Sequence, residues 1–324
     1  MKAKGKLVAL LLLTTLVLLA GCGQQPAPPD PANEINEPQA EPEPELATAF
    51  MVMIDNHAAA RPQHGLAQAD IVYELVCETG ITRFLAGFYW RDPVRVGPIR
   101  SIRYYYLHVA RAYDLPLAHV GGNMDALALR APLQIKSICA ITNAGSGFFT
   151  DSQRRRPHST YTTSERVLEI ATKRGYAQKG LPTLPLGDFS ATEQAEQVEL
   201  SYSSKYKVQW TYQSEAGHYL RLLNGQPHLT AEAEEIVASN IIIIEAPVKT
   251  VTVPVDGVQS EIKLLGEGKA LFVRDGRMAQ GKWRKEKPES HFQYFLADGS
   301  EFTYAPSAVW VQQVPSLERD VVVR

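Results

Sequence analysis

The first 22 residues of this chain indicate the cellular compartment in which the rest of it folds. Three lysines, Lys2, Lys4 and Lys6, precede an apolar run from Leu7 to Ala20. A basic start followed by an apolar segment of this length is typical of a bacterial secretion signal, and the run is shorter than a transmembrane helix requires. It ends in Leu19-Ala20-Gly21-Cys22, where small residues directly precede a cysteine. Whatever follows must therefore fold outside the cytoplasm.

Cys22 at the end of this leader predicts a lipid anchor. We expect residues 1–21 to be removed as a signal peptide and diacylglycerol to be attached to the sulfur of Cys22, with palmitate as a further acyl chain. Each buried CH₂ contributes about 0.8 kcal/mol, so several chains give a stable anchor. The sequence predicts an extracytoplasmic protein held to a bacterial membrane. An ordinary secretion signal with a chance cysteine is the alternative.

Residues 22–49 have a composition that does not support a hydrophobic core. They contain seven prolines and six acidic residues, with no lysine or arginine. Such a stretch buries too little apolar surface to offset the entropy lost on ordering it. We expect an extended tether, which at about 3 Å per residue spans roughly 80 Å.

The charge of the remaining chain argues against nucleic acid as a partner. Lys and Arg total 33 and Asp and Glu total 35; the leader holds three of the lysines and the tether six of the acids, which leaves 30 and 29. No net basic field remains to attract a polyanion over a distance. The membrane, through Cys22, and a cell-wall or envelope protein are the partners we expect.

The first folded segment mixes strands with helices. Strands are predicted at Phe50–Ile54, Ile71–Val76 and Ile81–Trp90, where β-branched and aromatic residues cluster between turn signals. A helix is predicted from Pro98, because apolar residues recur at helical spacing as far as Tyr113.

Further along, a second helix is predicted with Ser164 as its cap. We assign residues 50–190 to an N-terminal domain with mixed α/β structure.

Residues 197–318 are expected to form a β-rich C-terminal domain that folds on its own. Apolar and polar residues alternate over Tyr206–Tyr212, and Ile241–Ile244 is a continuous apolar run that favours a strand buried on both faces. Hairpin turns are indicated by Asn224-Gly225, Asp256-Gly257, Asp275-Gly276 and Asp298-Gly299. The predicted fold class of the whole chain is α+β.

Polar residues of the first domain are concentrated at strand ends and at the predicted helix start, where folds of this class usually gather a site. The candidate ligand-binding residues are Asp55, Asn56, Arg61, Gln63, Glu74, Glu78, Thr82, Arg83, Arg100, Ser101, Arg103, His119 and His158.

These runs, at this spacing, resemble the YerB-like lipoprotein family, a two-part family of secreted bacterial proteins without an assigned activity. In the first part the resemblance rests on Asp55-Asn56, Ala60-Arg61-Pro62-Gln63, Ala69-Asp70-Ile71-Val72, Glu78-x-Gly80-x-Thr82-Arg83, Gly97-Pro98-x-Arg100-Ser101-x-Arg103, His119-x-Gly121-Gly122 and Pro157-His158. In the second part it rests on Tyr206-x-Val208-x-Trp210, Gly268-Lys269, Asp275-Gly276 and Gly281-x-Trp283. The resemblance covers about residues 48–315. It implies an α+β first domain and a β-rich second one, and it supplies no reaction.

The arginines suggest an anion site. Arg100 and Arg103 are predicted to lie one turn apart near a helix N-terminus, whose free N–H groups and dipole favour an anion. Arg61 and Arg83 can add bidentate donors for a carboxylate or phosphate. The alternative is that these arginines pair with carboxylates of the chain and only stabilise the fold.

Two function classes remain open from these residues. The first is a binding or regulatory module that recognises an anionic envelope component or a partner protein. The second is an enzyme acting on cell-wall material, with Asp55 or Glu78 and His119 or His158 as acid and base. The sequence contains no H-E-x-x-H or Cys-x-x-Cys motif, so we assign neither a metal nor another cofactor.

Cys77 and Cys139 remain once Cys22 is set aside. A disulfide between them is permitted outside the cytoplasm, and two separate buried thiols are the alternative.

Overall fold

The computed structural model describes residues 49–78, 80–176 and 181–324. The predicted signal peptide, the lipidation of Cys22 and the tether lie outside these residues, apart from Ala49. In the ranges that are described, no helix is both long and apolar enough to cross a membrane.

The chain has the α+β fold that the sequence predicts. The first half, residues 49–176, contains β1 (Phe50–Asp55), η1 (Ala58–Ala60), η2 (Leu66–Gln68), β2 (Ile71–Glu78), β3 (Ile81–Phe88), α1 (Tyr104–Tyr113), β4 (Leu117–His119), α2 (Met124–Leu129), β5 (Ser137–Cys139), η3 (Gly145–Gly147), β6 (Phe149–Thr150), β7 (Thr160–Tyr161) and α3 (Ser164–Lys173).

The second half, residues 181–324, is almost entirely β-structure. It contains β8 (Glu193–Gln194), β9 (Gln197–Ser203), β10 (Tyr206–Gln213), β11 (His218–Leu223), β12 (Gln226–Pro227), β13 (Val237–Ala238), β14 (Asn240–Glu245), β15 (Val248–Val253), β16 (Gly257–Ile262), β17 (Gly266–Arg274), β18 (Arg277–Lys285), β19 (Gln293–Leu296), β20 (Val309–Val314), α4 (Leu317–Asp320) and β21 (Val321–Val323).

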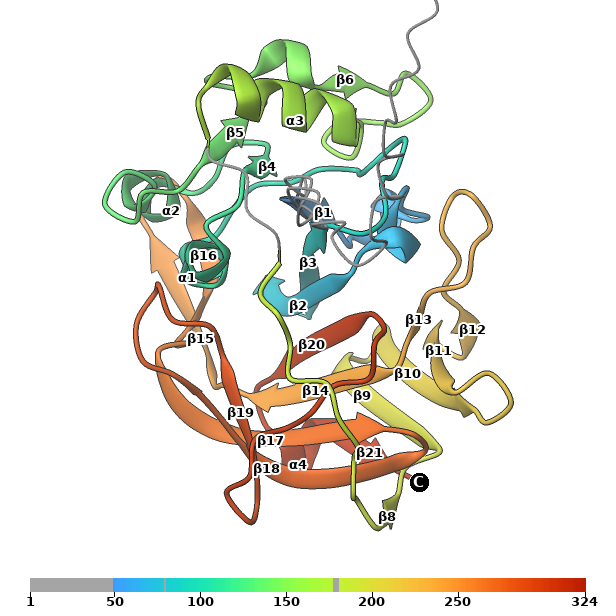
Figure 1. Ribbon diagram of the computed structural model, residues 1–324. Helices are drawn as coiled ribbons and strands as arrows, with labels where there is room; N and C mark the ends of the chain where they lie inside the picture. The colour runs from blue at the N-terminus through green and yellow to red at the C-terminus, as the bar shows by residue number, and fades with distance from the viewer. Residues whose placement is uncertain (1–48, 79, 177–180) are drawn as a thin grey trace, which may run out of the picture. The chain divides into compact units, whose positions relative to one another are not determined.

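One large mixed sheet joins the two halves. Its strand order is β19-β18-β17-β14-β20-β2-β3-β1-β4-β5, with β8 beside β18. The strand β20, drawn in red in Figure 1, lies between β14 and β2 and runs parallel to both. Val309 is aligned with Asn240 on one side and Ile71 on the other. The last long strand of the chain therefore occupies the middle of the sheet.

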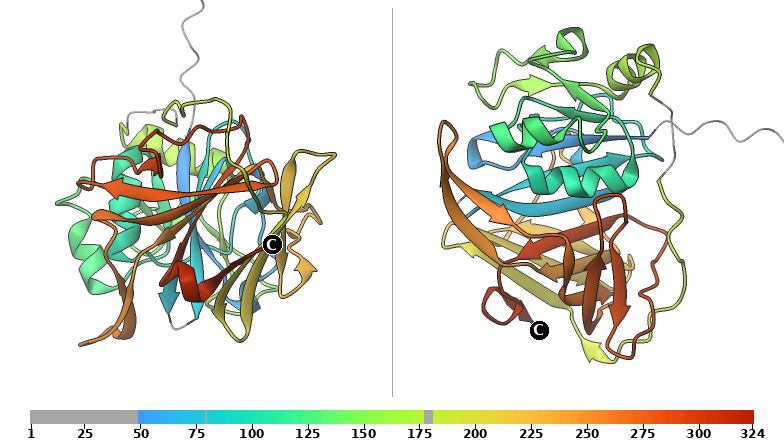
Figure 2. Two further views of the ribbon diagram at one scale, coloured as in Figure 1. Left: turned by 90° about the horizontal axis from the view of Figure 1, so that it is seen from below. Right: turned by 90° about the vertical axis from the view of Figure 1, so that its left-hand side faces the viewer.

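Each face of the large sheet is covered by different elements. Met51 and Met53 of β1 pack with α1 on one face, and Figure 2 shows α1 and α2 in front of the first-half strands in its right-hand view. Val52 and Ile54 pack on the other face with Val167 of α3. A smaller sheet of order β12-β11-β10-β9-β21, with β13 beside β11, covers that same face over the second half. Because both faces are covered, every residue of β1 is buried.

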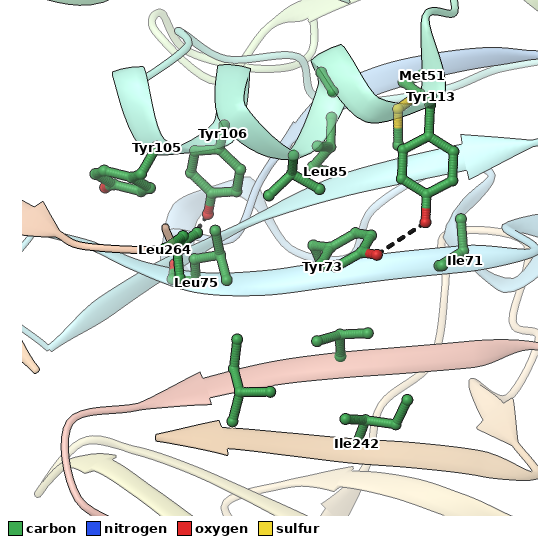
Figure 3. Packing of buried hydrophobic residues seen from close by; sticks show 14 of the residues in the cluster. Met51, Ile71, Tyr73, Leu75, Leu85, Tyr105, Tyr106, Tyr113, Ile242 and Leu264 are labelled. Carbon is green, nitrogen blue, oxygen red and sulfur yellow. Dashed lines mark hydrogen bonds between the residues drawn. The ribbon is translucent and has the colours of Figure 1, made fainter. Parts of the chain in front are cut away.

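The core under α1 is rich in tyrosine. Tyr105 and Tyr106 point from the helix onto β2 and β3, and the hydroxyl of Tyr106 donates to the carbonyl of Leu75 at 3.0 Å. Tyr113 at the helix end meets Tyr73 of β2, and their hydroxyls are 2.8 Å apart (Figure 3). Aromatic rings fill the space while their hydroxyls find partners, as buried tyrosines usually require.

The prediction that a helix starts at Pro98 is wrong. Helix α1 starts six residues later, and residues 98–102 are extended. The N–H of Arg100 donates to the carbonyl of Met53 at 2.9 Å, and that of Ile102 donates to the carbonyl of Gly121 at 3.1 Å. These hydrogen bonds to neighbouring strands replace those of a first helical turn. Arg100 and Arg103 are thus not one helical turn apart.

The cap of α3 also lies one residue earlier than predicted. Thr163 is the cap, and its hydroxyl accepts the N–H of Arg166 at 3.2 Å. The hydroxyl of Ser164 instead donates to the carbonyl of Pro93 at 2.7 Å.

The domain boundary between residues 190 and 197 stays a prediction. The described residues 49–324 form one compact unit, and both hydrophobic clusters contain residues of both halves. A chain cut near residue 197 would leave β20 without β2 as its neighbour. The expectation that the second half folds on its own conflicts with this sharing of strands.

Candidate functional site

The extended segment 98–102 creates the candidate site. Strands β1 and β4 are parallel neighbours at Met51 and Val52, and the segment then separates them. The N–H of Asp55 donates to the carbonyl of Pro98, and that of Val120 donates to the carbonyl of Arg100. A split between parallel strands at their carboxyl ends is the usual place for a ligand in such sheets.

Asp55, at the end of β1, is the central carboxylate. It is 2% exposed, and its Oδ1 accepts the N–H of His57 at 3.0 Å. Its Oδ2 lies 2.7 Å from Nδ1 of His158 and 3.1 Å from Nε of Arg100. One carboxylate thus holds a histidine and an arginine that are distant in the sequence.

The hydrogen bonds of the two histidines define their neutral forms. The N–H of Ala59 donates to Nδ1 of His57 at 3.1 Å, so a neutral His57 carries its proton on Nε2. Nδ1 of His158 faces Asp55, an acceptor, so a neutral His158 leaves Nε2 as a base. The two rings stack with centroids 4.8 Å apart and planes at 9°. Parallel rings do not aim their nitrogens at one shared point.

Glu78, at the end of β2, holds two further arginines. Its Oε1 accepts Nη2 of Arg83 at 3.0 Å and Nη2 of Arg103 at 3.1 Å. Nη1 of Arg83 donates to the carbonyl of Ser101 at 2.9 Å, so Ser101 contributes its backbone here. The Glu78 side chain is 41% exposed, whereas that of Arg83 is 4% exposed.

We call these residues the arginine site: Asp55, His57, Glu78, Arg83, Arg100, Arg103 and His158. Its three arginines face two carboxylates, so it carries an excess of positive charge even when both histidines are neutral. Burial lowers the pKa of Arg100, and the charge of Asp55 offsets part of this effect. The excess charge and the partly exposed guanidinium groups favour an anion as an additional partner.

A second polar network lies deeper and is centred on Glu74. Its Oε1 accepts the hydroxyls of Thr82, at 2.8 Å, and of Tyr206. Its Oε2 accepts Nη2 of Arg221 and Nε2 of Gln312, both at 2.8 Å. The side chains of Glu74 and Arg221 are fully buried. We call this set the Glu74 network.

Asn56 connects the two polar groups. Its Nδ2 donates to the hydroxyl of Tyr206 at 2.6 Å, while its Oδ1 accepts Nε of Arg61 at 3.1 Å and Nε2 of Gln63 at 3.2 Å. Gln63 also donates to the carbonyl of Asp55 at 3.0 Å. The guanidinium of Arg61 lies over the ring of Tyr206, with its centre 4.8 Å from the ring centroid.

His228 closes the network on its far side. Its Nε2 donates to Oε1 of Gln63 at 3.0 Å, and its Nδ1 accepts from Arg221. Burial lowers the pKa of His228 well below its ordinary value, and the charges of Arg221 and Arg61 lower it further. His228 is therefore neutral at physiological pH.

His119 belongs to neither set. Its Nδ1 donates to the carbonyl of Gly121 at 2.8 Å, and its Nε2 accepts the hydroxyl of Ser137 at 2.7 Å. It lies at the end of β4 opposite Cys139 of β5. Cys139 and Cys77 are separate buried thiols, which settles the alternatives left open by the sequence.

The structure thus divides the predicted residues. Asp55, Glu78, Arg83, Arg100, Arg103 and His158 meet in the arginine site, with Ser101 present through its carbonyl. Asn56, Arg61, Gln63, Glu74 and Thr82 belong to the Glu74 network or contact it. Within the described ranges, no group of three or more His, Cys, Asp and Glu residues is arranged to hold a metal ion.

Five residues of these sets were not predicted: His57, Tyr206, Arg221, His228 and Gln312. The sequence holds one signal for them. Arg221 occupies an inward position of β11, two residues after the buried Tyr219. A charged residue at an apolar position of an alternating strand indicates a buried partner.

Comparison with known proteins extends over almost the whole chain. Residues 36–177 match the N-terminal domain, and residues 198–311 the C-terminal domain, of a family described as "Protein of unknown function (DUF3048)".

A relative from Bacillus subtilis (strain 168), named "Putative lipoprotein YerB", is 29% identical over 313 residues, which cover 93% of this chain and 92% of the relative. The crystal structure of the YerB protein from Bacillus subtilis is also similar. It has a TM-score of 0.77 and 26% identity, and the match covers 88% of this chain and 97% of that one. These matches confirm the resemblance seen in the motifs: the protein belongs to the two-part DUF3048 family, which includes YerB.

Proposed function

We propose that the protein is a membrane-anchored lipoprotein of the cell envelope that binds an anionic wall component at the arginine site. The leader that ends in Cys22 supports the anchor, and so does the name of the Bacillus subtilis relative. The anchor sets the location of the protein, and the arginine site supplies the binding chemistry.

The observation that carries this proposal is the shared use of two carboxylates by three arginines. Arg100 shares Oδ2 of Asp55 with His158, and Arg83 shares Oε1 of Glu78 with Arg103. Arg100 and Arg103 keep further N–H donors, and their side chains are 24% and 14% exposed. A phosphate or carboxylate placed between them would gain charge-assisted hydrogen bonds.

Binding of purified wall fragments tests this function. Isothermal titration calorimetry would measure the affinity of the protein for teichoic acid, which carries phosphate, and for muropeptides, which carry carboxylates. Arg100→Ala should weaken binding at least tenfold, which corresponds to about 1.4 kcal/mol. Arg156→Ala removes an exposed arginine of a nearby loop and serves as the control, with a change below about twofold expected from weak surface electrostatics.

The outcomes separate the sources of the anion. Binding of one fragment class identifies it as the ligand. Binding of an acidic peptide but of neither fragment would assign the site to a partner protein. If none of the three binds, the proposed function is wrong.

A second candidate function rests on the Asp55–His158 pair. The 2.7 Å contact orients the imidazole and leaves Nε2 as a base, an arrangement suited to removing a proton from water or a hydroxyl. Incubation with wall fragments and mass analysis of the products tests it. New products made by the natural protein, and absent with His158→Gln and Asp55→Asn, would establish an enzyme. Unchanged masses would leave binding as the function.

A further inference from the structure

A groove lined mainly by carbon atoms lies away from the polar residues of the proposed site. It has a volume of about 780 Å³ and adjoins a chamber of about 190 Å³. Both spaces are lined by Ile71, Tyr113, Pro182, Thr183 and Leu184. Together they fall in the size range of ligand sites, which are usually apolar with a few polar groups.

The groove walls come from five parts of the chain, one of which is the segment of residues 305–308 before β20. Ile71 of β2 lies on the sheet face, Tyr113 ends α1, and Leu184 comes from the segment that links the two halves. Trp90, just after β3, and Leu186 complete the opening with 76% and 62% of their surface exposed. Two large apolar side chains exposed at one opening indicate a surface that another molecule covers.

The mouth of the groove holds one carboxylate and one guanidinium group. Oδ2 of Asp70 accepts the N–H groups of Tyr89, at 2.6 Å, and Trp90, at 2.9 Å, so its charge is used within the wall. Arg91 donates through Nη2 to the carbonyl of Ala69 at 3.0 Å, and its Nε lies 3.8 Å from Oδ1 of Asp70, so the two side chains form an ion pair. The Arg91 side chain is 46% exposed, and its remaining N–H groups are available to an anionic head group.

The inner end of the space is lined mainly by aromatic and aliphatic side chains, with His291, Gln293 and Glu301 among its polar residues. The hydroxyls of Tyr73 and Tyr113 bond to each other, as Figure 3 shows. Phe292 and Phe302 add further carbon surface. The apolar part of this lining favours an apolar ligand end, because burying it against carbon removes it from water at little cost.

We propose that this groove binds the acyl chain of an anionic amphiphile, with its head group on Arg91. A channel lined mainly by carbon, with the partly exposed guanidinium of Arg91 beside Asp70 at its mouth, matches a single apolar chain that ends in a carboxylate or phosphate. A sugar needs many hydrogen-bonding partners along its length, and the walls supply few. The site shares no residue with the arginine site and does not depend on the function proposed for it.

Bromine quenching of tryptophan fluorescence tests this proposal directly. Trp90 lies at the groove mouth, whereas Trp210, Trp310 and Trp283 are at most 2% exposed. The mature chain, residues 22–324, made without lipid, would be titrated with 9,10-dibromostearate below its micelle concentration. We expect saturable quenching that unbrominated stearate reverses and that is largely lost in Trp90→Phe.

Matched variants assign the binding to the groove. Leu184→Asp should weaken binding at least tenfold, and Arg91→Ala should weaken binding of the fatty acid more than that of the uncharged alcohol. Ile141→Asp changes an exposed apolar residue, 70% exposed, that does not line the groove, and should have no effect. Thermal unfolding of each variant checks that the fold is intact.

Displacement experiments and one further variant distinguish between the sources of the acyl chain and between the two proposed sites. Displacement of dibromostearate by lysophosphatidylglycerol would point to membrane phospholipid as the source of the chain, and displacement by stearate alone to free fatty acid. Arg100→Ala should leave this binding unchanged, which distinguishes the groove from the arginine site. Quenching that does not saturate, or that is the same in a folded Leu184→Asp variant, would overturn the proposal.

Discussion

The Glu74 network and the arginine site are built from the same residue types. They differ in how many of their hydrogen-bonding groups are already paired within the protein and in how far they are exposed to solvent. In the network, each oxygen of Glu74 accepts at least two donors, and the pair with Arg221 has no exposed surface. In the arginine site, Glu78 is 41% exposed and holds two arginines through one oxygen.

The difference indicates what each set contributes. A fully buried pair whose two carboxylate oxygens are both occupied by donors leaves no room for a ligand, and the loss of one partner leaves a buried charge. A partly exposed set with excess positive charge contributes less to stability and keeps donors available on Arg100 and Arg103. We therefore expect the first to stabilise the fold and the second to bind.

The largest effect is expected when the chain is cut between the halves. Residues 197–324 alone lack Glu74 and the strand β2, so Arg221 and β20 both lose partners. We expect no cooperative thermal transition, measured by circular dichroism, whereas residues 49–324 should unfold in one. A cooperative β-type transition of the short chain would show that the network is dispensable for folding.

Arg221→Met should be the most destabilising single change in either polar set. It leaves the carboxylate of Glu74 buried without a cation, which costs about 3–5 kcal/mol in the free energy of unfolding. Urea denaturation measures this change. The double variant Glu74→Gln with Arg221→Met should recover part of the loss, because no unpaired charge remains. A loss below about 1 kcal/mol in the single variant would contradict the assignment.

His228→Gln should change how stability depends on pH. The pKa of His228 is well below 6.5 in the folded protein, so below pH 6.5 the unfolded chain binds a proton that the folded chain does not. This residue therefore removes stability as pH falls, by up to about 1.4 kcal/mol per pH unit. The variant should lose stability less steeply between pH 6.5 and 5. Identical slopes for the two proteins would refute this, and above pH 7 the slopes should agree.

The smallest effect on stability is expected from Arg100→Ala. Its pair with Asp55 is partly exposed, and such pairs contribute at most about 1 kcal/mol. Asp55 also keeps His158 and the N–H of His57 as partners. Urea denaturation should show a loss well below that of Arg221→Met, while anion binding falls tenfold. A loss of 3 kcal/mol or more would make the arginine site structural.

The sequence predicts the strands correctly where neighbouring residues alone determine the conformation. Phe50–Ile54, Ile71–Val76 and Ile241–Ile244 form strands because apolar and β-branched residues are contiguous there. Residues 98–102 misled the prediction because Pro98 and the spacing of apolar residues favour a helix. The actual conformation depends on carbonyls of Met53 and Gly121, which lie far away in the sequence.

The candidate site was predictable only where a residue's type stands out against its neighbours in the sequence. Asp55, Arg100 and His158 stand at strand ends or in polar runs, so their residue types were informative. Gln312 was not, because it lies within a strand that is otherwise indistinguishable from core. Its role depends on Glu74, which is 238 positions away, and no local pattern reports such a pairing.

The central place of β20 also determines when the molecule can fold. Residues 309–314 are synthesised after every other strand of the large sheet, and until they are present β2 and β14 both remain open edges of incomplete sheets. Pairings between such distant positions form slowly, and open edges invite association with other chains. A nascent chain that ends before Val309 therefore stays unfinished over most of its length. The large sheet can therefore close only once β20 has been made.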